Sequence, residues 1–113
     1  MKISTVTLIL SALAQESRLL IYRTLIQAGP SGMAAGKISE MTGISPSSLS
    51  FHLKELYHAE LVRSRSESRF VIYSANFKIM SQVIKYLTDN CCGGNPCLLT
   101  QVTNKIEEKL YET

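Results

Sequence analysis

Residues 45–56 read Ser45-Pro-Ser-Ser-Leu-Ser-Phe-His-Leu-Lys-Glu-Leu56 and predict a helix with one buried side. Ser45 suits the N-cap and Pro46 suits the first helical turn. Leucines at helical spacing form an apolar stripe at Leu49, Leu53 and Leu56. The rest of the helix carries small hydroxyls, aromatic rings and one lysine, namely Ser47, Ser48, Ser50, Phe51, His52 and Lys54. Lysine and glutamate are the usual residues of a solvated helix face. The small hydroxyls here therefore indicate a face that a binding partner can approach closely.

A shorter helix is expected just before this one. It places Ile38 and Met41 inward and ends at Thr42-Gly43. A helix, a short turn containing glycine, and a second helix with a small, polar first turn are typical of the helix-turn-helix. In that motif, small side chains let the second helix approach the major groove closely. We therefore predict a helix-turn-helix over about residues 35–58.

The period of the apolar residues changes to two after this motif. Residues 61–66 and 69–75 read as two strands joined around Glu67-Ser68, so a hairpin is predicted over about 61–75. Three of the twelve cations lie within seven residues of it, at Arg63, Arg65 and Arg69. An ordinary solvated hairpin is one interpretation. Its place directly after a helix-turn-helix favours a wing that lies along the DNA backbone.

The remaining periodicity is helical. One helix is predicted over about residues 5–14, and a second ends at Gly29. Residues 31–36 are expected to form a loop, and a further helix is expected over about 76–90. Residues 98–113 form either a last amphipathic helix or a loosely held tail. The predicted fold is mainly α, with five to six helices and a two-stranded wing.

Composition limits the class of protein. A chain of 113 residues and 12.5 kDa with 45% hydrophobic content predicts a single globular domain over 1–113. The N-terminal apolar run is broken by Thr5, Thr7 and Ser11, so we do not interpret it as a secretory signal. The odd cysteine count fits reduced thiols and a cytoplasmic location. No run is long enough to span a membrane. The net charge of +3 matters because the cations cluster.

All three cysteines lie between residues 91 and 97, at Cys91, Cys92 and Cys97. Trivalent arsenic takes three sulfurs in a pyramid, whereas structural zinc generally needs a fourth ligand such as Asp89 or a residue from a partner chain. Adjacent residues of a helix point about 100° apart, so Cys91 and Cys92 can face one ion only where the helix has ended or unwound. Buried cysteines, or a disulfide between Cys92 and Cys97, are the alternatives.

The exposed side of the 45–56 helix and the wing supply the candidate DNA contacts. We expect Ser47, Ser48, Ser50 and His52 near base edges or the flanking backbone, and Lys54, Arg63, Arg65 and Arg69 nearer phosphates. His52 could equally pack against the preceding helix. Phe51 could contact a thymine methyl group or be half-buried on the flank of the helix.

The segments Ala12-Leu-Ala-Gln-Glu-Ser-Arg18, Ser45 to Leu56, Ala59-Glu-Leu-Val-Arg63 and the arginine-rich hairpin closing in Tyr73-Ser-Ala75 resemble the ArsR family of winged-helix repressors. The resemblance covers about residues 8–90. It implies a homodimer with helices one and five at the interface. It also implies an inverted-repeat operator in double-stranded DNA and release when an inducer binds. Glu60 departs from the glycine that members usually carry ahead of the hairpin.

A second departure concerns the inducer site. Many arsenic-responsive members carry Cys-Val-Cys on the third helix, where this chain has no cysteine. The sequence instead resembles a subset with cysteines after the fifth helix, whose ligand is As(III) or Sb(III). The resemblance thus assigns Cys91, Cys92 and Cys97 as the inducer ligands of an arsenical-resistance repressor.

Three interpretations remain open at this point: a metalloid-responsive repressor, a sensor of divalent cadmium, lead or mercury, and a thiol-redox switch. An enzyme is disfavoured because the sequence has no Cys-x-x-Cys, nucleotide-binding loop or acid–base pair near the thiols. The sequence leaves open the inducer, the operator and the genes controlled. It also leaves open whether the thiol site closes within one chain or across the dimer.

Overall fold

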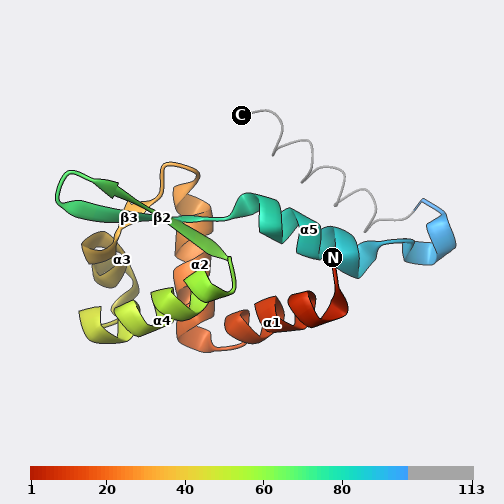
Figure 1. Cartoon of the computed structure of the whole chain (residues 1–113), viewed down its shortest axis with the longest axis horizontal. Helices are drawn as coiled ribbons and strands as arrows, with labels where there is room; N and C mark the ends of the chain where they lie inside the picture. Colours follow the sequence, from red (N-terminus) through yellow and green to blue (C-terminus); the bar gives the residue numbers. More distant parts are fainter. Residues whose placement is uncertain (97–113) are drawn as a thin grey trace. The chain divides into compact units, whose positions relative to one another are not determined.

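The computed structural model describes residues 1–96. The chain divides into two compact units, one of residues 2–76 and a second that begins at Phe77 and also includes Met1. The first unit contains four helices and a small sheet, and the second contains one helix followed by a short turn (Figure 1). Within the described part of the chain, no helix is long and apolar enough to cross a membrane.

The helices of the first unit are α1 (Ile3–Leu13), α2 (Glu16–Ala28), α3 (Ala35–Thr42) and α4 (Pro46–His58). Their shared core is aliphatic and has essentially no solvent exposure at Ile21, Leu25, Ile38, Leu56 and Leu61. This packing confirms the predicted helix-turn-helix, which α3 and α4 form. Met41 was expected to face inward but is 58% exposed, because α3 needs only Ile38 to meet its neighbours.

The sheet has three antiparallel strands in the order β1-β3-β2. The predicted hairpin is confirmed as β2 (Val62–Glu67) and β3 (Phe70–Ala75), with Glu67 opposite Phe70. The third strand, β1 (Met33–Ala34), lies where a loop was expected, and its residues pair with Tyr73 and Ile72. Two residues carry no measurable periodicity, so only the pairing with β3 reveals this strand.

The turn between α4 and β2 has an unusual backbone. Glu60 adopts φ 62°, a left-handed conformation that favours glycine, and the Asn76 side chain donates a hydrogen bond to its carbonyl oxygen at 2.9 Å. The backbone N–H of Asn76 also donates to the Leu61 carbonyl oxygen at 2.9 Å. The chain therefore makes, with glutamate, a left-handed turn of the kind that favours glycine.

The second unit contains α5 (Phe77–Thr88), two residues shorter at its C-terminal end than the predicted helix. A single 3₁₀ turn, η1 (Cys91–Gly94), follows it. Left-handed backbone at Asn90, Cys92, Gly93 and Gly94 prevents the helix from continuing. The predicted last helix or tail, residues 98–113, lies outside the described residues.

Candidate nucleic-acid interface and thiol turn

The beginning of α4 is fixed by its own sequence and by the turn before it. The Ser45 hydroxyl accepts a hydrogen bond from the Ser48 N–H at 3.4 Å, and Pro46 occupies the first helical turn as expected. Gly43 has φ 75°, the usual conformation at a helix C-terminus. The Ser39 hydroxyl of α3 donates to the Ile44 carbonyl oxygen at 2.6 Å. These contacts fix the turn that joins α3 to α4.

One side of α4 is buried and the opposite side is open. The predicted stripe of Leu49, Leu53 and Leu56 is at most 2% exposed. The exposed positions include Ser47, Ser50, Phe51 and Lys54. Their spacing of three, four and seven residues puts them on one face of the helix. One face of α4 therefore packs in the core, and the opposite face is accessible to a binding partner.

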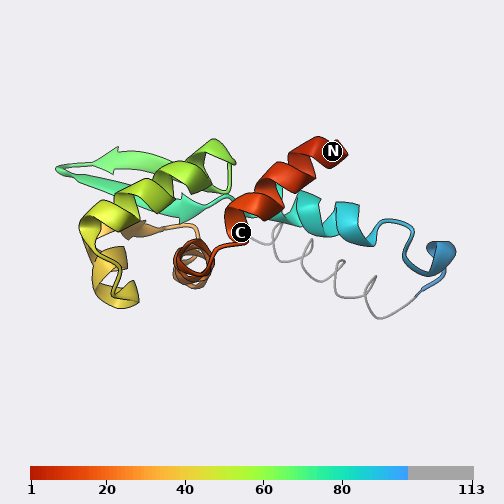
Figure 2. The same ribbon diagram turned by 90° about the horizontal axis from the view of Figure 1, so that it is seen from below.

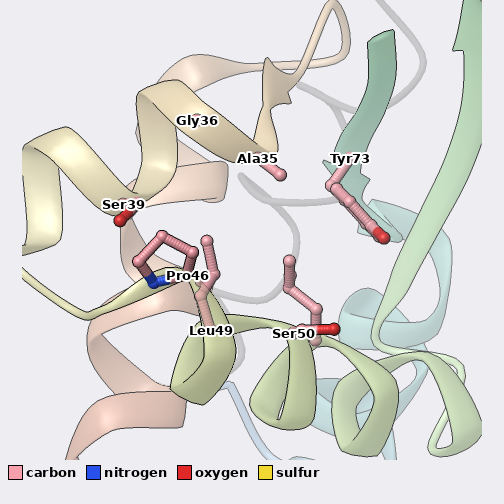
Figure 3. A pocket seen from close by; sticks show the side chains of 8 residues that line it. Ala35, Gly36, Ser39, Pro46, Leu49, Ser50 and Tyr73 are labelled. Carbon is pink, nitrogen blue, oxygen red and sulfur yellow. The ribbon is translucent and has the colours of Figure 1, made fainter.

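A small cavity of about 130 Å³ lies where α3, α4 and β3 meet. Its walls are mainly apolar and are formed by Ala35, Gly36, Ser39, Pro46, Leu49, Ser50, Leu53 and Tyr73. The Tyr73 side chain points from β3 toward α4 (Figure 3). Tyr73 was named from the sequence only as part of the family resemblance, and its place at this cavity was not predicted.

His52 is half-buried and lies beside a residue of α2. One guanidinium nitrogen of Arg18, Nη1, is 3.5 Å from His52 Nδ1. The same guanidinium donates from Nε to the Ala12 carbonyl oxygen at 2.6 Å. Arg18 therefore connects the end of α1 to α4. Arg18 was named from the sequence only as part of a segment that carries the family resemblance, so this contact was missed. The Nδ1 edge of the His52 ring thus faces Arg18 of α2.

The arginines of the wing differ in their surroundings. Arg65 donates from Nη2 to the Ser31 carbonyl oxygen at 2.7 Å and to Glu67 Oε2 at 3.3 Å. Arg63 is exposed on the same strand two residues away, and Arg69 is exposed in the hairpin turn. Arg65 thus ties the wing to the loop before β1, whereas Arg63 and Arg69 project toward solvent.

The elements predicted to contact DNA share one end of the first unit. Two perpendicular views place the hairpin tip, α3 and the N-terminal end of α4 at that end (Figures 1 and 2). The proposed base-contacting serines are on α4 and the wing arginines are on β2 or in its turn. Whether each side chain contacts DNA stays a prediction.

The thiol turn, residues 91–96, brings two of the three cysteines together. Cys91 is half-buried, Cys92 is exposed, and their Sγ atoms are 3.6 Å apart. The close approach follows from the φ of 58° at Cys92, because the turn has left the regular helical path there. The third predicted ligand, Cys97, lies outside the described residues. Among residues 1–96, no group of three His, Cys, Asp or Glu side chains is arranged to hold a metal.

Comparisons with known proteins define the class. Residues 13–65 match a family described as a helix-turn-helix domain. The chain is 30% identical over 84 residues to the HTH-type transcriptional regulator YgaV of Escherichia coli, an alignment that covers 74% of this chain and 83% of YgaV. It is 34% identical over 80 residues to the nodulation protein NolR of Rhizobium meliloti, covering 71% of this chain and 63% of NolR. The chain therefore spans somewhat less than two thirds of NolR.

Solved structures agree with this class. HlyU from Vibrio cholerae is 28% identical, with a TM-score of 0.62 over 79% of this chain and 94% of HlyU. An ArsR-like regulator from Rhodococcus has a TM-score of 0.67 over 96% of this chain and 89% of that chain, at 18% identity, which supports the fold alone. The fold is thus that of a winged helix-turn-helix DNA-binding protein. The chain belongs to the HTH-type transcriptional regulators, and its fold is similar to that of ArsR-like regulators.

Proposed function

We propose that this regulator is a repressor that binds an inverted-repeat operator as a homodimer and leaves DNA when As(III) or Sb(III) binds Cys91, Cys92 and Cys97. The observation that carries this proposal is the 3.6 Å separation of the Cys91 and Cys92 Sγ atoms. For sulfur bonds of about 2.3 Å to one pyramidal or tetrahedral centre, two thiolates lie about 3.4–3.8 Å apart. Two ligands of a trithiolate site are thus already at a suitable spacing.

The residues after Cys92 suit a site that closes on the ion. Gly93 and Gly94 have φ of 66° and 91°, and Pro96 directly precedes the third cysteine. Glycine allows this backbone to rearrange at little cost. A third thiolate then completes the pyramid around a metalloid, which needs no fourth ligand.

The proposal of a dimer rests on apolar side chains that a single chain leaves exposed. In the first unit they include Ile3 and Leu8 on α1, which are 71% and 59% exposed, and Leu19 and Leu20 on α2. In the second unit, Leu87 of α5 is 58% exposed. Helices that are apolar on more than one side usually pack against a further partner. Two copies would present two α4 helices to successive major grooves, as an inverted repeat requires.

Release needs a defined difference in binding free energy. To change the DNA-bound population from 99:1 to 1:99, the inducer must favour the released state by about 10⁴-fold, or about 5.5 kcal/mol. Three metalloid–sulfur bonds at the end of α5 are a sufficient source if they form fully only in the released conformation. Binding that is equal in both conformations would shift nothing.

The decisive experiment is a fluorescence-anisotropy titration of the full chain on DNA selected from a random duplex library. The protein is kept reduced with a phosphine, because dithiols would chelate arsenic. Arsenite, antimonite, cadmium and zinc are added separately. We expect arsenite and antimonite to weaken DNA binding at least 100-fold. Cys91→Ser, Cys92→Ser and Cys97→Ser should each bind DNA normally and lose the response.

Asn95→Ser is the matched control, since it changes the same turn without removing a thiol, and it should respond like the original protein. Release of Cys92→Ser by arsenite would contradict the proposed site. Release by cadmium or zinc in place of arsenite would indicate a fourth ligand and a divalent sensor.

A thiol-redox switch is the second candidate, because the chain is 27% identical to a HlyU structure described as reduced. In this alternative, oxidation of Cys92 with Cys97 would release DNA. The same titration separates the two candidates. Diamide would release DNA, reductant would restore binding, and arsenite under full reduction would have no effect.

A further inference from the structure

Phe51 is a large apolar residue in the middle of the exposed face of α4. It is 57% exposed, which excludes the interpretation that it is half-buried on the flank of the helix. Its neighbours on that face are Ser47, Ser50 and Lys54, all polar and exposed. The phenyl ring is therefore an apolar group placed among short hydroxyls in the first turns of α4.

The next residue supplies a hydrogen-bond donor beside that ring. The rings of Phe51 and His52 meet edge to face, with centroids 5.5 Å apart. Arg18 approaches His52 Nδ1, and a guanidinium can only donate hydrogen bonds. An Nδ1 that accepts from Arg18 would place the ring hydrogen of His52 on Nε2. The pair Phe51–His52 thus offers an apolar surface next to an N–H donor.

Only one DNA base presents the complement of this pair in the major groove. Thymine carries the C5-methyl group beside the O4 acceptor, whereas cytosine presents an N4 donor that would oppose the histidine N–H. Guanine presents two acceptors without a methyl group, and adenine presents an acceptor and a donor. The pair therefore has the apolar surface and the hydrogen-bond donor that recognition of thymine needs.

We propose that Phe51 and His52 together recognise one thymine in each half-site. Phe51 packs on the C5-methyl group and His52 donates from Nε2 to O4. Arg18 is a positioning residue, because it fixes the histidine ring from its Nδ1 side and does not itself reach the base. This inference rests on the proposed function only in that α4 enters the major groove, and it is independent of the thiol site.

The test replaces each thymine of the selected operator in turn with deoxyuridine, which lacks only the methyl group. Dissociation constants are then measured for the original protein and for Phe51→Ala. At one thymine per half-site, we expect the original protein to bind about fourfold more weakly after the replacement, the effect of losing one buried methyl group. Phe51→Ala should bind both DNAs equally.

Lys54→Ala is the control on the same face, since loss of a phosphate contact should weaken binding to both DNAs by the same factor. Phe51→Leu should recover part of the methyl preference. Equal binding of thymine and deoxyuridine at every position by the original protein would overturn the proposal, as would an unchanged preference in Phe51→Ala. Failure to select any DNA would instead contradict the proposed function itself.

The role of Arg18 has a separate readout. Long-range ¹⁵N–¹H spectra of the free protein should show His52 with its hydrogen on Nε2, and Arg18→Gln should give a mixture of the two ring tautomers. A single Nε2–H form in Arg18→Gln would show that Arg18 does not position the ring.

Discussion

The first unit and the thiol turn are shaped by different forces. In residues 2–76 the positions of the helices and strands follow from a continuous aliphatic core, in which Leu25, Ile38 and Leu56 are fully buried. In the turn that follows α5, η1 contains no buried residue, and four residues from Asn90 to Gly94 have left-handed backbone. The DNA-contacting geometry is therefore coupled to global stability, while the thiol turn can change conformation without unfolding the rest. Such a division suits the proposed function, in which the thiol turn changes conformation on binding an inducer and the DNA-binding elements keep theirs.

The largest effect on stability is expected at Gly32. Gly32 has φ 74°, and a Cβ atom there would overlap the Tyr73 carbonyl oxygen of β3. Gly32→Ala must therefore either push β1 away from β3 or distort the loop that Arg65 holds through Ser31. We expect it to lower the free energy of unfolding by at least about 3 kcal/mol, measured by urea denaturation.

Gly36→Ala is the matched control. Gly36 is exposed in α3 and an added Cβ would meet no other part of the fold, so alanine should raise helix stability by about 0.5–1 kcal/mol. Equal stability of the two alanine variants would show that the close approach of Gly32 to β3 does not hold the sheet.

A smaller change of opposite sign is expected at Tyr22 in α2. Its side chain is 4% exposed, and its hydroxyl has no hydrogen-bond partner among the described residues. Removing an unpaired buried hydroxyl relieves a desolvation cost, so Tyr22→Phe should raise the free energy of unfolding by about 1 kcal/mol. Loss of stability in Tyr22→Phe would mean that the hydroxyl has a partner in solution.

Tyr22 also gives a pH dependence that the variant lacks. Burial raises the pKa of Tyr22 from 10.0 to about 12. Below about pH 10 the phenol is protonated in both folded and unfolded chains. Between about pH 10 and 12 the unfolded chain loses the proton first, so folded stability falls, by at most about 1.4 kcal/mol per pH unit. The difference in stability between the original protein and Tyr22→Phe should widen over this range.

The smallest effect is expected in the thiol turn. The double variant Cys91→Ser, Cys92→Ser removes two sulfur atoms from a turn whose described residues are not buried. Its free energy of unfolding should lie within about 0.5 kcal/mol of the original value, because substitutions away from a core or network rarely do more. A loss above about 2 kcal/mol would mean that the turn is part of the folded core.

The predictions that the structure confirms concern helices of several turns and strands with several alternating residues. The leucine stripe of α4, the N-cap at Ser45 and the hairpin all follow from short-range pattern. Met41 was predicted wrongly because apolar spacing shows which residues share a side of α3, but not how much of that side a neighbour covers. Glu60 shows a similar limit, since its left-handed backbone is supported by Asn76, sixteen residues away.

The candidate site was predicted in its composition but not in its contacts. The serines of α4, the wing arginines and the cysteine cluster were all apparent from residue type and spacing. The contact of Arg18 with His52 joins residues 34 apart, and that of Arg65 with the Ser31 carbonyl joins another pair 34 apart. Neither leaves a pattern along the chain, because each depends on how two helices, or a strand and a loop, pack together.

The sequence by itself determined the class of protein, the two helices of the motif, the wing and the supply of thiols, because helical and strand periods and capping residues act over a few neighbouring residues. Only the tertiary structure decided that β1 joins the sheet, that Arg18 approaches His52 beside an exposed Phe51, and that the Cys91 and Cys92 sulfurs lie 3.6 Å apart. The physical reason is that the first two features arise where distant segments meet in space. The third arises from a left-handed backbone at Cys92, a residue type that rarely adopts this conformation.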